Sequence, residues 1–375
     1  MRIVIDENMP LVDQLFAPFG EIVRVPGRRM DAATLADADV LLVRSVTRVD
    51  EALLAQNTRL QFVGTATIGT DHVDQAALAE RGIPFFSAPG CNRISVGEYV
   101  ISALLVLAER HQLSLAGMTL GIVGAGNTGS AVAERALALG MHVCLCDPPR
   151  AAAGDARDFV DLETVLACDV VSFHVPLTRD GACPTWHMLA ADQIAALHGE
   201  QILINASRGD VWDNQALLQR QQGDRPLRLV MDVWEHEPQL LVPLIAHTEL
   251  ATPHIAGYSL EGKMRGSYML YEAWCALHGE APRMTLSDLL PPAAVNQVVL
   301  GANADPALVR RLVHLVYDVR RDDALFRAHY QDAASFDWLR KTYPERREWS
   351  SLTVQSHDPA PWAALGFSVT PPQAG

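Results

Sequence analysis

The sequence predicts an α/β protein whose sheets are parallel. Short runs rich in Val, Ile and Leu alternate with helical stretches from the N-terminus to about residue 280, and this alternation is typical of a parallel sheet with helices on both faces. From Thr119 onward several of the runs are apolar almost throughout, as expected for strands buried on both faces. A glycine-rich segment directly after the Thr119 run indicates that this second series is doubly wound.

Length and charge exclude several classes of protein. A chain of 375 residues corresponds to two or three domains at roughly 100–200 residues each. Its hydrophobic fraction of 49% is ordinary for a globular protein and argues against a disordered or fibrous chain. The formal net charge of −14 argues against nucleic-acid or anionic-membrane partners, because binding to either needs a basic surface.

Compartment signals favour the cytoplasm. The six cysteines lack C-x-x-C spacing, which favours a reduced intracellular protein over a disulfide scaffold or a metal site. The N-terminus begins directly with a strand-like run and lacks the apolar core of a signal peptide. No stretch approaches the roughly 20 apolar residues of a membrane span. We therefore expect a cytoplasmic protein.

The first α/β series occupies about the first 95 residues. Its expected elements are strands at 2–6, 39–43, 60–66 and 83–87, with short helices at 34–38 and 73–81. Ser95 and Glu98 then have the spacing of a capping box, in which the serine caps the backbone and the glutamate reaches back to it. This spacing predicts the start of a long apolar helix that runs to about His111.

The second series is more regular. Strands are expected at 119–123, 142–147, 169–174, 201–205, 228–232 and 250–252, with helices at 128–139, 191–197 and 214–221. A further helix is expected at 258–278. Prolines at 282, 291 and 292 then indicate a linker, and one amphipathic helix is expected at 306–330.

The glycine-rich segment has the G-x-G-x-x-G pattern of a dinucleotide-binding loop. Gly124 permits the tight turn, Gly126 lets the backbone approach a pyrophosphate, and Gly129 lets the helix pack on the strand. Asn127 lies inside the pattern, at the helix N-terminus whose N–H groups bind phosphate. The preceding strand and the following helix make the pattern specific.

Asp147 ends the next strand, roughly 20 residues after the glycines, where a carboxylate accepts hydrogen bonds from the ribose hydroxyls. Because a carboxylate repels a 2′-phosphate, NAD is favoured over NADP. Arg150, three residues later, weakens this preference slightly.

Four polar side chains follow the later strands, where the loops of a doubly wound sheet carry chemistry. Arg208 could bind a carboxylate bidentately, and His254 is of the residue type that titrates near neutrality. Glu237 beside His254 would orient the imidazole and stabilise the imidazolium, while Asp232 could bond the nicotinamide amide. Each residue alone is as easily structural, but the four together favour a base, its partner and an anion clamp.

These motifs resemble those of the D-isomer-specific 2-hydroxyacid dehydrogenases. The resemblance covers roughly residues 1–280 and rests on Gly124–Gly129, Asp147, Asn205–Gly209, Asp232–Pro238 and Thr252–Gly257. It implies that Arg208, Glu237 and His254 are catalytic. No metal is expected, because Arg208 and the imidazolium of His254 supply the electrophilic help. It also implies NAD contacts from Gly124, Gly126, Asn127, Gly129, Asp147, Ala206, Ser207, Arg208, Asp232 and Gly257.

The resemblance also implies the domain organisation. It places a discontinuous flavodoxin-like substrate domain at 1–95 and 258–285, a Rossmann NAD-binding domain at 96–257, and a small C-terminal α+β domain at 286–375 that forms a homodimer. Three stretches, at 3–10, 42–47 and 336–347, match a branch of the family that oxidises a phosphorylated hydroxyacid in pyridoxal 5′-phosphate synthesis.

The same resemblance implies that Ser45, Thr67 and Tyr258 contact the substrate. Arg44 and Arg93 lie in substrate-domain loops and could bind its phosphate, although a surface role is as easily assigned to each. Two alternatives stay open. One is another member of the family, for example one that acts on 3-phosphoglycerate, and the other is an NAD-sensing binding protein on the same fold.

Overall fold

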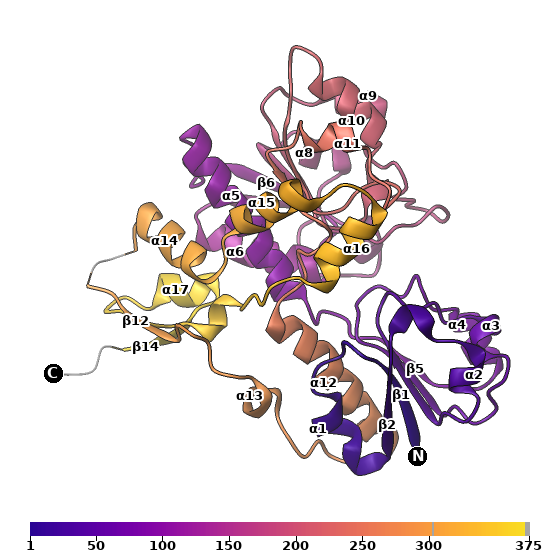
Figure 1. Cartoon of the computed structure of the whole chain (residues 1–375). Helices are drawn as coiled ribbons and strands as arrows, with labels where there is room; N and C mark the ends of the chain where they lie inside the picture. Colours follow the sequence, from indigo (N-terminus) through magenta and orange to yellow (C-terminus); the bar gives the residue numbers. More distant parts are fainter. Residues whose placement is uncertain (302–303, 372–375) are drawn as a thin grey trace. The chain divides into compact units, whose positions relative to one another are not determined.

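The computed structural model describes residues 1–301 and 304–371. The chain forms two compact units: Met1–Asn92 with Ser259–Pro292, and Arg93–Tyr258 with the segment from Ala293 (Figure 1). Both units are built on parallel sheets, so the α/β prediction is confirmed. None of the helices in the described part of the chain is long and apolar enough to cross a membrane.

The first unit contains a five-stranded parallel sheet in the order β2-β1-β3-β4-β5, which is the flavodoxin-like order. Its strands are β1 (Arg2–Asp6), β2 (Glu21–Val25), β3 (Val40–Val43), β4 (Phe62–Thr65) and β5 (Phe85–Phe86). Strand β2 was not expected from the sequence. It lies at the sheet edge with no fully buried residue, so it lacks the apolar run that marks the other strands.

Helices cover both faces of this sheet. The helices of the unit are α1 (Val12–Phe16), α2 (Ala32–Leu35), α3 (Glu51–Leu54), α4 (Gln75–Glu80), α12 (Leu260–Leu277) and α13 (Leu286–Leu289). On one face, Leu270 and Trp274 of α12 pack in one core with Phe16 and Phe62. Because this core needs α12, the chain returns to its first unit after completing most of the second.

The second unit contains a six-stranded parallel sheet in the order β11-β10-β9-β8-β6-β7. All six expected strands are present, as β6 (Thr119–Val123), β7 (His142–Cys146), β8 (Val170–Phe173), β9 (Ile202–Asn205), β10 (Arg228–Met231) and β11 (Leu250–Ala251). The associated helices are α5 (Arg93–His111), α6 (Asn127–Ala138), α7 (Pro148–Ala152), α8 (Leu162–Leu166), α9 (Ala191–Ala196), α10 (Asn214–Gln221) and α11 (Val242–Ile245).

The capping box expected at Ser95 and Glu98 is wrong. Helix α5 begins at Arg93, so both residues lie inside it. Glu98 is fully buried and its Oε1 accepts a hydrogen bond of 2.8 Å from the backbone N–H of Trp349. Burial, together with the nearby Glu348, raises the pKa of Glu98 to about 8. A distant segment of the chain, which local spacing does not reveal, therefore determines the role of this glutamate.

The C-terminal segment has a separate parallel sheet of β12 (Gln297–Val299), β13 (Thr353–Gln355) and β14 (Ser368–Thr370), as Figure 1 shows. Its helices are α14 (Pro306–Val316), α15 (Val319–His329), α16 (Ala333–Lys341) and α17 (Ala360–Leu365). The single helix expected at 306–330 is therefore two helices. Tyr317 is extended between them, and its carbonyl accepts a hydrogen bond from Ser102 Oγ, while Asp318 caps α15.

Helix α15 packs against the β11 edge of the six-stranded sheet. Asp323 Oδ1 accepts a hydrogen bond of 2.8 Å from the N–H of Ala251 in β11. Arg327 donates to the carbonyls of Ile245 and Thr248. These contacts satisfy backbone groups beside the edge strand and attach the C-terminal helices to the strand that leads into the His254 loop.

Candidate active site

The loops of the second unit that carry most of the predicted site residues leave the same edge of one sheet. Because its strands are parallel, their carboxyl ends lie together. Strands β7 and β8 lie on opposite sides of β6, so the chain reverses its direction across the sheet there, and this switch point is where doubly wound sheets bind ligands. Along this edge, the loops after β11, β10 and β9 carry His254, Glu237 and Arg208, and those after β6 and β7 carry the glycines and Asp147.

The three glycines have different surroundings. Gly124 has a φ of +91°, and a Cβ there would lie 2.7 Å from the carbonyl oxygen of His174. A Cβ on Gly129 would lie 2.0 Å from the carbonyl oxygen of Gly124. At Gly126, by contrast, the nearest atom to a Cβ would be Arg150 Nη2 at 3.9 Å. Gly124 and Gly129 are thus required by the close backbone packing of the fold, whereas Gly126 leaves open space at the start of α6.

The N-terminus of α6 is suited to bind an anion. Gly126 is its N-cap residue and supplies no side-chain cap, so the first N–H groups of the helix are available to a phosphate. Asn127, the first residue of the helix, is exposed. Arg157, which we did not single out in the sequence, steadies the loop by donating to the carbonyl of Ala125 and to Ser130 Oγ, at 2.9 Å each.

The different surroundings of the glycines lead to a prediction for alanine substitutions. Gly126→Ala should leave the melting temperature near that of the unmodified protein, but raise the Kd for a dinucleotide by roughly one to two orders of magnitude, because the methyl group overpacks the pyrophosphate contact. Gly129→Ala should lower the melting temperature, because its Cβ overlaps the Gly124 carbonyl. Thermal unfolding and equilibrium binding check both. Unchanged binding by Gly126→Ala would contradict a pyrophosphate at this position.

Asp147 is held in place by backbone amides. Its Oδ2 accepts a hydrogen bond of 2.9 Å from Ala125 N–H, and its Oδ1 accepts one of 3.1 Å from Arg150 N–H. Arg150 Nε lies 3.6 Å from Asp147 Oδ2. The carboxylate thus lies beside the glycine loop, where a ribose would follow a pyrophosphate, and the neighbouring arginine partly balances its charge.

His254 and Glu237 form a hydrogen-bonded pair, with 2.7 Å between His254 Nδ1 and Glu237 Oε2. The other carboxylate oxygen, Oε1, accepts a hydrogen bond of 2.8 Å from Trp234 N–H. Burial alone would raise the pKa of Glu237, but the charge and hydrogen bond of His254 and the Trp234 amide lower it below its ordinary value. Glu237 is therefore ionised, and Nε2 of His254 is the ring nitrogen left to exchange a proton with a ligand.

Asp232 fixes the backbone of the His254 loop. His254 has a left-handed φ of +57°, and its N–H donates to the Asp232 carbonyl at 2.7 Å. The buried Asp232 carboxylate accepts hydrogen bonds from Thr252 Oγ1 and from the N–H groups of Ile255 and Ala256. Burial raises the pKa of Asp232 despite these donors. Asp232, a predicted partner of the nicotinamide amide, thus holds the His254 loop in this conformation.

Arg208 follows β9 in a loop that its own polar groups tie together. Asn205 Oδ1 accepts hydrogen bonds from Ser207 N–H and Oγ, and Asn205 Nδ2 donates to the Arg208 carbonyl. Arg208 Nη1 donates to the Ser207 carbonyl at 2.8 Å. A Cβ on Gly209 would lie 1.8 Å from the Trp234 carbonyl oxygen, so glycine allows close approach to the loop that carries Glu237.

The remaining predicted residues are divided between the two units. In the first unit, Arg44 and Ser45 follow β3 and Thr67 follows β4, and these adjacent parallel strands end at one edge of the sheet. Arg44 forms an ion pair of 3.1 Å with the buried Asp6. Arg93 does not lie in a loop of the first unit, as the sequence suggested: it starts α5 in the second unit, and its Nη1 lies 3.9 Å from Glu134 Oε1.

Tyr258 and Gly257, which end the His254 loop, also belong to the second unit. The ring of Tyr258 packs edge-on against that of Tyr343, with 5.7 Å between centroids. The guanidinium of Arg340 lies 5.8 Å from the centroid of the Tyr258 ring. The sequence pattern did not single out Arg340, because nothing local distinguishes it from other helical arginines.

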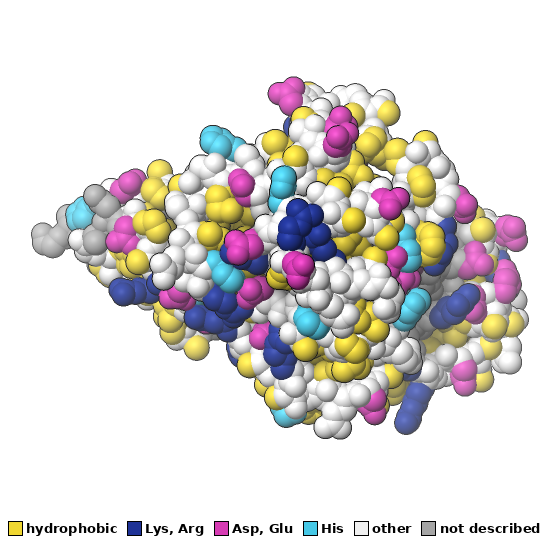
Figure 2. All heavy atoms as spheres, turned by 90° about the horizontal axis from the view of Figure 1, so that it is seen from above, with side chains coloured by type: hydrophobic (Ala, Val, Ile, Leu, Met, Phe, Trp, Pro, Cys, Tyr) yellow, Lys and Arg dark blue, Asp and Glu magenta, His cyan; other side chains and the backbone are white. Residues whose placement is uncertain are grey.

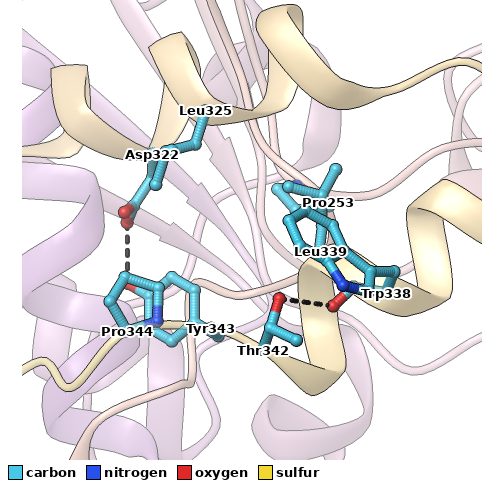
Figure 3. A pocket seen from close by; sticks show the side chains of 8 residues that line it. All are labelled: Pro253, Asp322, Leu325, Trp338, Leu339, Thr342, Tyr343 and Pro344. Atoms are coloured by element: carbon cyan, nitrogen blue, oxygen red, sulfur yellow. Dashed lines mark hydrogen bonds between the residues drawn. The ribbon is translucent and has the colours of Figure 1, made fainter.

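A mostly apolar pocket of about 260 Å³ lies next to the same loop (Figure 3). It is lined by Pro253, Asp322, Leu325, Trp338, Leu339, Thr342, Tyr343 and Pro344. Its acidic residue, Asp322, accepts a hydrogen bond of 2.7 Å from Tyr343 Oη. An apolar lining with a carboxylate does not suit an anionic ligand, so we do not assign this pocket to a hydroxyacid.

Comparison with known families matches two parts of the chain. The model described as the NAD binding domain of D-isomer specific 2-hydroxyacid dehydrogenases matches residues 105–256. A model described only as a domain of unknown function matches residues 289–366. The second match covers the separate C-terminal sheet and the helices around it.

Curated relatives match over the whole length. An erythronate-4-phosphate dehydrogenase from Tolumonas auensis is 62% identical over 371 residues, which are 99% of this chain and 100% of the relative. One from Aeromonas hydrophila is 63% identical over 375 residues, with the same coverage.

Solved structures share the fold over about three quarters of the chain. The TT0316 protein from Thermus thermophilus has a TM-score of 0.63 at 28% identity, covering 76% of this chain and 99% of its own. A D-lactate dehydrogenase from Aquifex aeolicus, solved with NAD and lactic acid, has a TM-score of 0.61 at 23% identity, with 75% and 96% coverage.

Proposed function

Because the chain belongs to the erythronate-4-phosphate dehydrogenases, a branch of the D-isomer specific 2-hydroxyacid dehydrogenases, we propose that it oxidises 4-phospho-D-erythronate to 3-hydroxy-2-oxo-4-phosphobutanoate. NAD is the oxidant, and the reaction serves pyridoxal 5′-phosphate synthesis. The observation that carries the proposal is the His254–Glu237 pair on the same sheet edge as Arg208, the glycine loop and Asp147.

The residues present fit NAD. The open space at Gly126 and the uncapped start of α6 suit a pyrophosphate, and Asp147 suits the adenosine ribose. Ala206, Ser207, Asp232 and Gly257 lie on loops toward the other end of the same edge, where the nicotinamide half would follow. When bound, NAD supplies the acceptor for the hydride that leaves C2 of the substrate.

The side chains of the second unit supply the acid–base chemistry. Nε2 of His254 takes the proton of the C2 hydroxyl, and the ionised Glu237 stabilises the imidazolium through Nδ1. The Arg208 guanidinium holds the C1 carboxylate and stabilises the forming carbonyl oxygen. The proposal also includes five substrate-binding residues. They are Ser45, Thr67 and Tyr258, with Arg44 and Arg93.

An absorbance assay tests this function. The purified full chain with NAD should form NADH rapidly with 4-phospho-D-erythronate, and much more slowly with 3-phospho-D-glycerate, D-glycerate or D-lactate. Faster turnover of one of these other acids would assign the chain a different substrate within the family. Tight NAD binding without any turnover would instead favour a nucleotide-sensing protein on the same fold.

We also propose that the protein is a cytoplasmic homodimer joined through its C-terminal segment. All six cysteines are free thiols, as in a reducing compartment. Among the described residues of the C-terminal segment, the exposed large apolar side chains are Val295, Val299, Leu315 and Trp338. Val299 belongs to β12, an edge strand of the small sheet, and such edges pair readily with another chain. Sedimentation of the same preparation should therefore give twice the chain mass of 40.9 kDa.

The charge distribution is consistent with a small anionic substrate. On the face drawn in Figure 2, basic side chains lie in small groups beside acidic ones. Because the net charge is −14, we expect individual arginines, and not a broad basic surface, to bind a phosphorylated acid.

A further inference from the structure

Helix α16 of the C-terminal segment lies beside the loops of the candidate active site. The backbone N–H of Leu240 donates to Tyr330 Oη at 3.1 Å, just after the loop that carries Glu237. Pro253, the residue before His254, lines one pocket with Trp338 and Leu339 of α16, as Figure 3 shows. Tyr330, which precedes α16, therefore lies beside the loop that carries Glu237, and α16 itself lies beside the residue before His254.

Arg340 in the last turn of α16 is directed toward this region. Its guanidinium lies 5.8 Å from the ring centroid of Tyr258 and 5.9 Å from that of Phe336. Glu237 and Asp232 act on it through their charges, whereas Tyr258 is the group that hydrogen-bonds it. Within the part of the chain that the structure describes, the buried Nε of Arg340 has no hydrogen-bond partner.

Among the residues that the structure describes, none forms a dedicated ion pair with Arg340. Burial alone would lower the pKa of its guanidinium, but Tyr258 and the two carboxylates raise it above its ordinary value, so it is cationic at any physiological pH. Both carboxylates have other tasks, since Glu237 holds His254 and Asp232 holds the His254 loop. Withdrawing part of a cation from water without a hydrogen-bonded counter-ion costs free energy, and a bound anion would offset that cost.

Arg44 and Arg93, the arginines that the sequence offers as phosphate ligands, each lie near a carboxylate of the protein. Arg44 forms its ion pair with the buried Asp6, and Arg93 is half-buried near Glu134. Arg340 also comes from the region matched by the second family model. The solved structures with the same fold cover only about three quarters of this chain, although they are matched over nearly their whole length. About a quarter of this chain therefore has no counterpart in those structures.

From these observations we propose that Arg340 is a substrate-binding residue that contacts the phosphate of the phosphorylated hydroxyacid. This inference rests on the proposed function. In that function Arg208 holds the C1 carboxylate, and the phosphate at the far end of the substrate needs cations of its own, to which Arg340 would add one beside Arg44 and Arg93. The Nη groups of Arg340 would bind the phosphate oxygens, and Tyr258 would fix the orientation of the guanidinium. The C-terminal segment then contributes to substrate specificity as well as to assembly.

Two substrates that differ only in the phosphate test the proposal. For Arg340→Ala in the full chain, kcat/KM with 4-phospho-D-erythronate should fall roughly 10- to 100-fold, the usual scale for losing a charged hydrogen bond. The slow reaction with D-erythronate should change by less than about threefold, because that substrate lacks the phosphate. Inorganic phosphate should inhibit the unmodified enzyme competitively and Arg340→Ala much more weakly.

Parallel losses with both substrates would overturn the proposal and make Arg340 a positioning residue for the His254–Glu237 pair. Unchanged kinetics with the phosphorylated substrate would overturn it as well. Lys341→Ala, which removes an exposed charge from the next position of α16, is the matched control and should behave like the unmodified enzyme.

Folding and function are checked separately. The melting temperature and the Kd for NAD show whether Arg340→Ala is folded, and Arg340→Gln replaces it if it is not. If the unmodified enzyme does not oxidise 4-phospho-D-erythronate, the proposed function fails by itself. Calorimetric titration of inorganic phosphate into the NAD complex then tests Arg340 independently, because equal affinities for the unmodified protein and Arg340→Gln would exclude a phosphate site there.

Discussion

Replacing His254 with alanine is expected to lower kcat by roughly two to four orders of magnitude, the scale for losing a general base. The substitution removes the ring whose Nδ1 is held by Glu237 at 2.7 Å and whose Nε2 faces the ligand in our proposal. The Kd for NAD should change little, since the pyrophosphate and ribose contacts lie on other loops. Steady-state kinetics and a binding titration on the same preparation measure both quantities.

The chain contains a matched control for this substitution. His187 also has a left-handed φ, of 47°, and its Nε2 lies 2.6 Å from a carboxylate oxygen of Glu235. If His254 acts as the base, His187→Ala should retain most of the activity, although it removes a similar histidine–carboxylate pair. Comparable losses in the two variants would mean that the damage is structural, and near-normal turnover by His254→Ala would refute its role.

A second large effect is expected for Arg208→Lys. We expect kcat/KM to fall by roughly two orders of magnitude, because an ammonium cannot reproduce the two parallel hydrogen bonds of a guanidinium to a carboxylate. The loss should appear in both KM and kcat, since Arg208 is proposed to hold the C1 carboxylate and also to stabilise the forming carbonyl oxygen. Steady-state kinetics with 4-phospho-D-erythronate measure it.

Arg228→Lys provides the comparison. Arg228 starts β10, at the amino end of the sheet, and its Nη2 lies 3.2 Å from Glu200. The same exchange of guanidinium for ammonium should leave the kinetics there nearly unchanged. If Arg208→Lys retains its KM and kcat, the substrate carboxylate is bound by another group.

Much of the fold could be predicted from the sequence because its signals are local. Strands buried on both faces are continuous apolar runs, so all six strands of the larger sheet were expected close to their observed ends. The predicted catalytic residues follow from the regular geometry of a parallel sheet. Side chains that directly follow its strands lie on one edge, independently of the conformation of the loops. The half-exposed edge strand β2 lacks such a run and was missed.

Local signals failed where a distant segment provides the partner. Ser95 and Glu98 have capping-box spacing, yet Glu98 bonds to Trp349, 251 residues later. The amphipathic pattern continues through Tyr317, yet the helix breaks there, where the Tyr317 carbonyl meets Ser102. In both places a buried polar group has to be satisfied, and the tertiary contact outweighs the local preference.

By itself, the sequence determined the two parallel-sheet units, the glycine loop and the placement of His254, Glu237 and Arg208 at the ends of strands. These features depend on residues close together in the chain and on the regular geometry of parallel sheets. Only the tertiary structure decided that Asp232 holds the His254 loop and that Arg340 of the C-terminal segment lies next to Tyr258. Such contacts join residues distant in sequence, and the packing of whole helices and strands determines them rather than any local pattern.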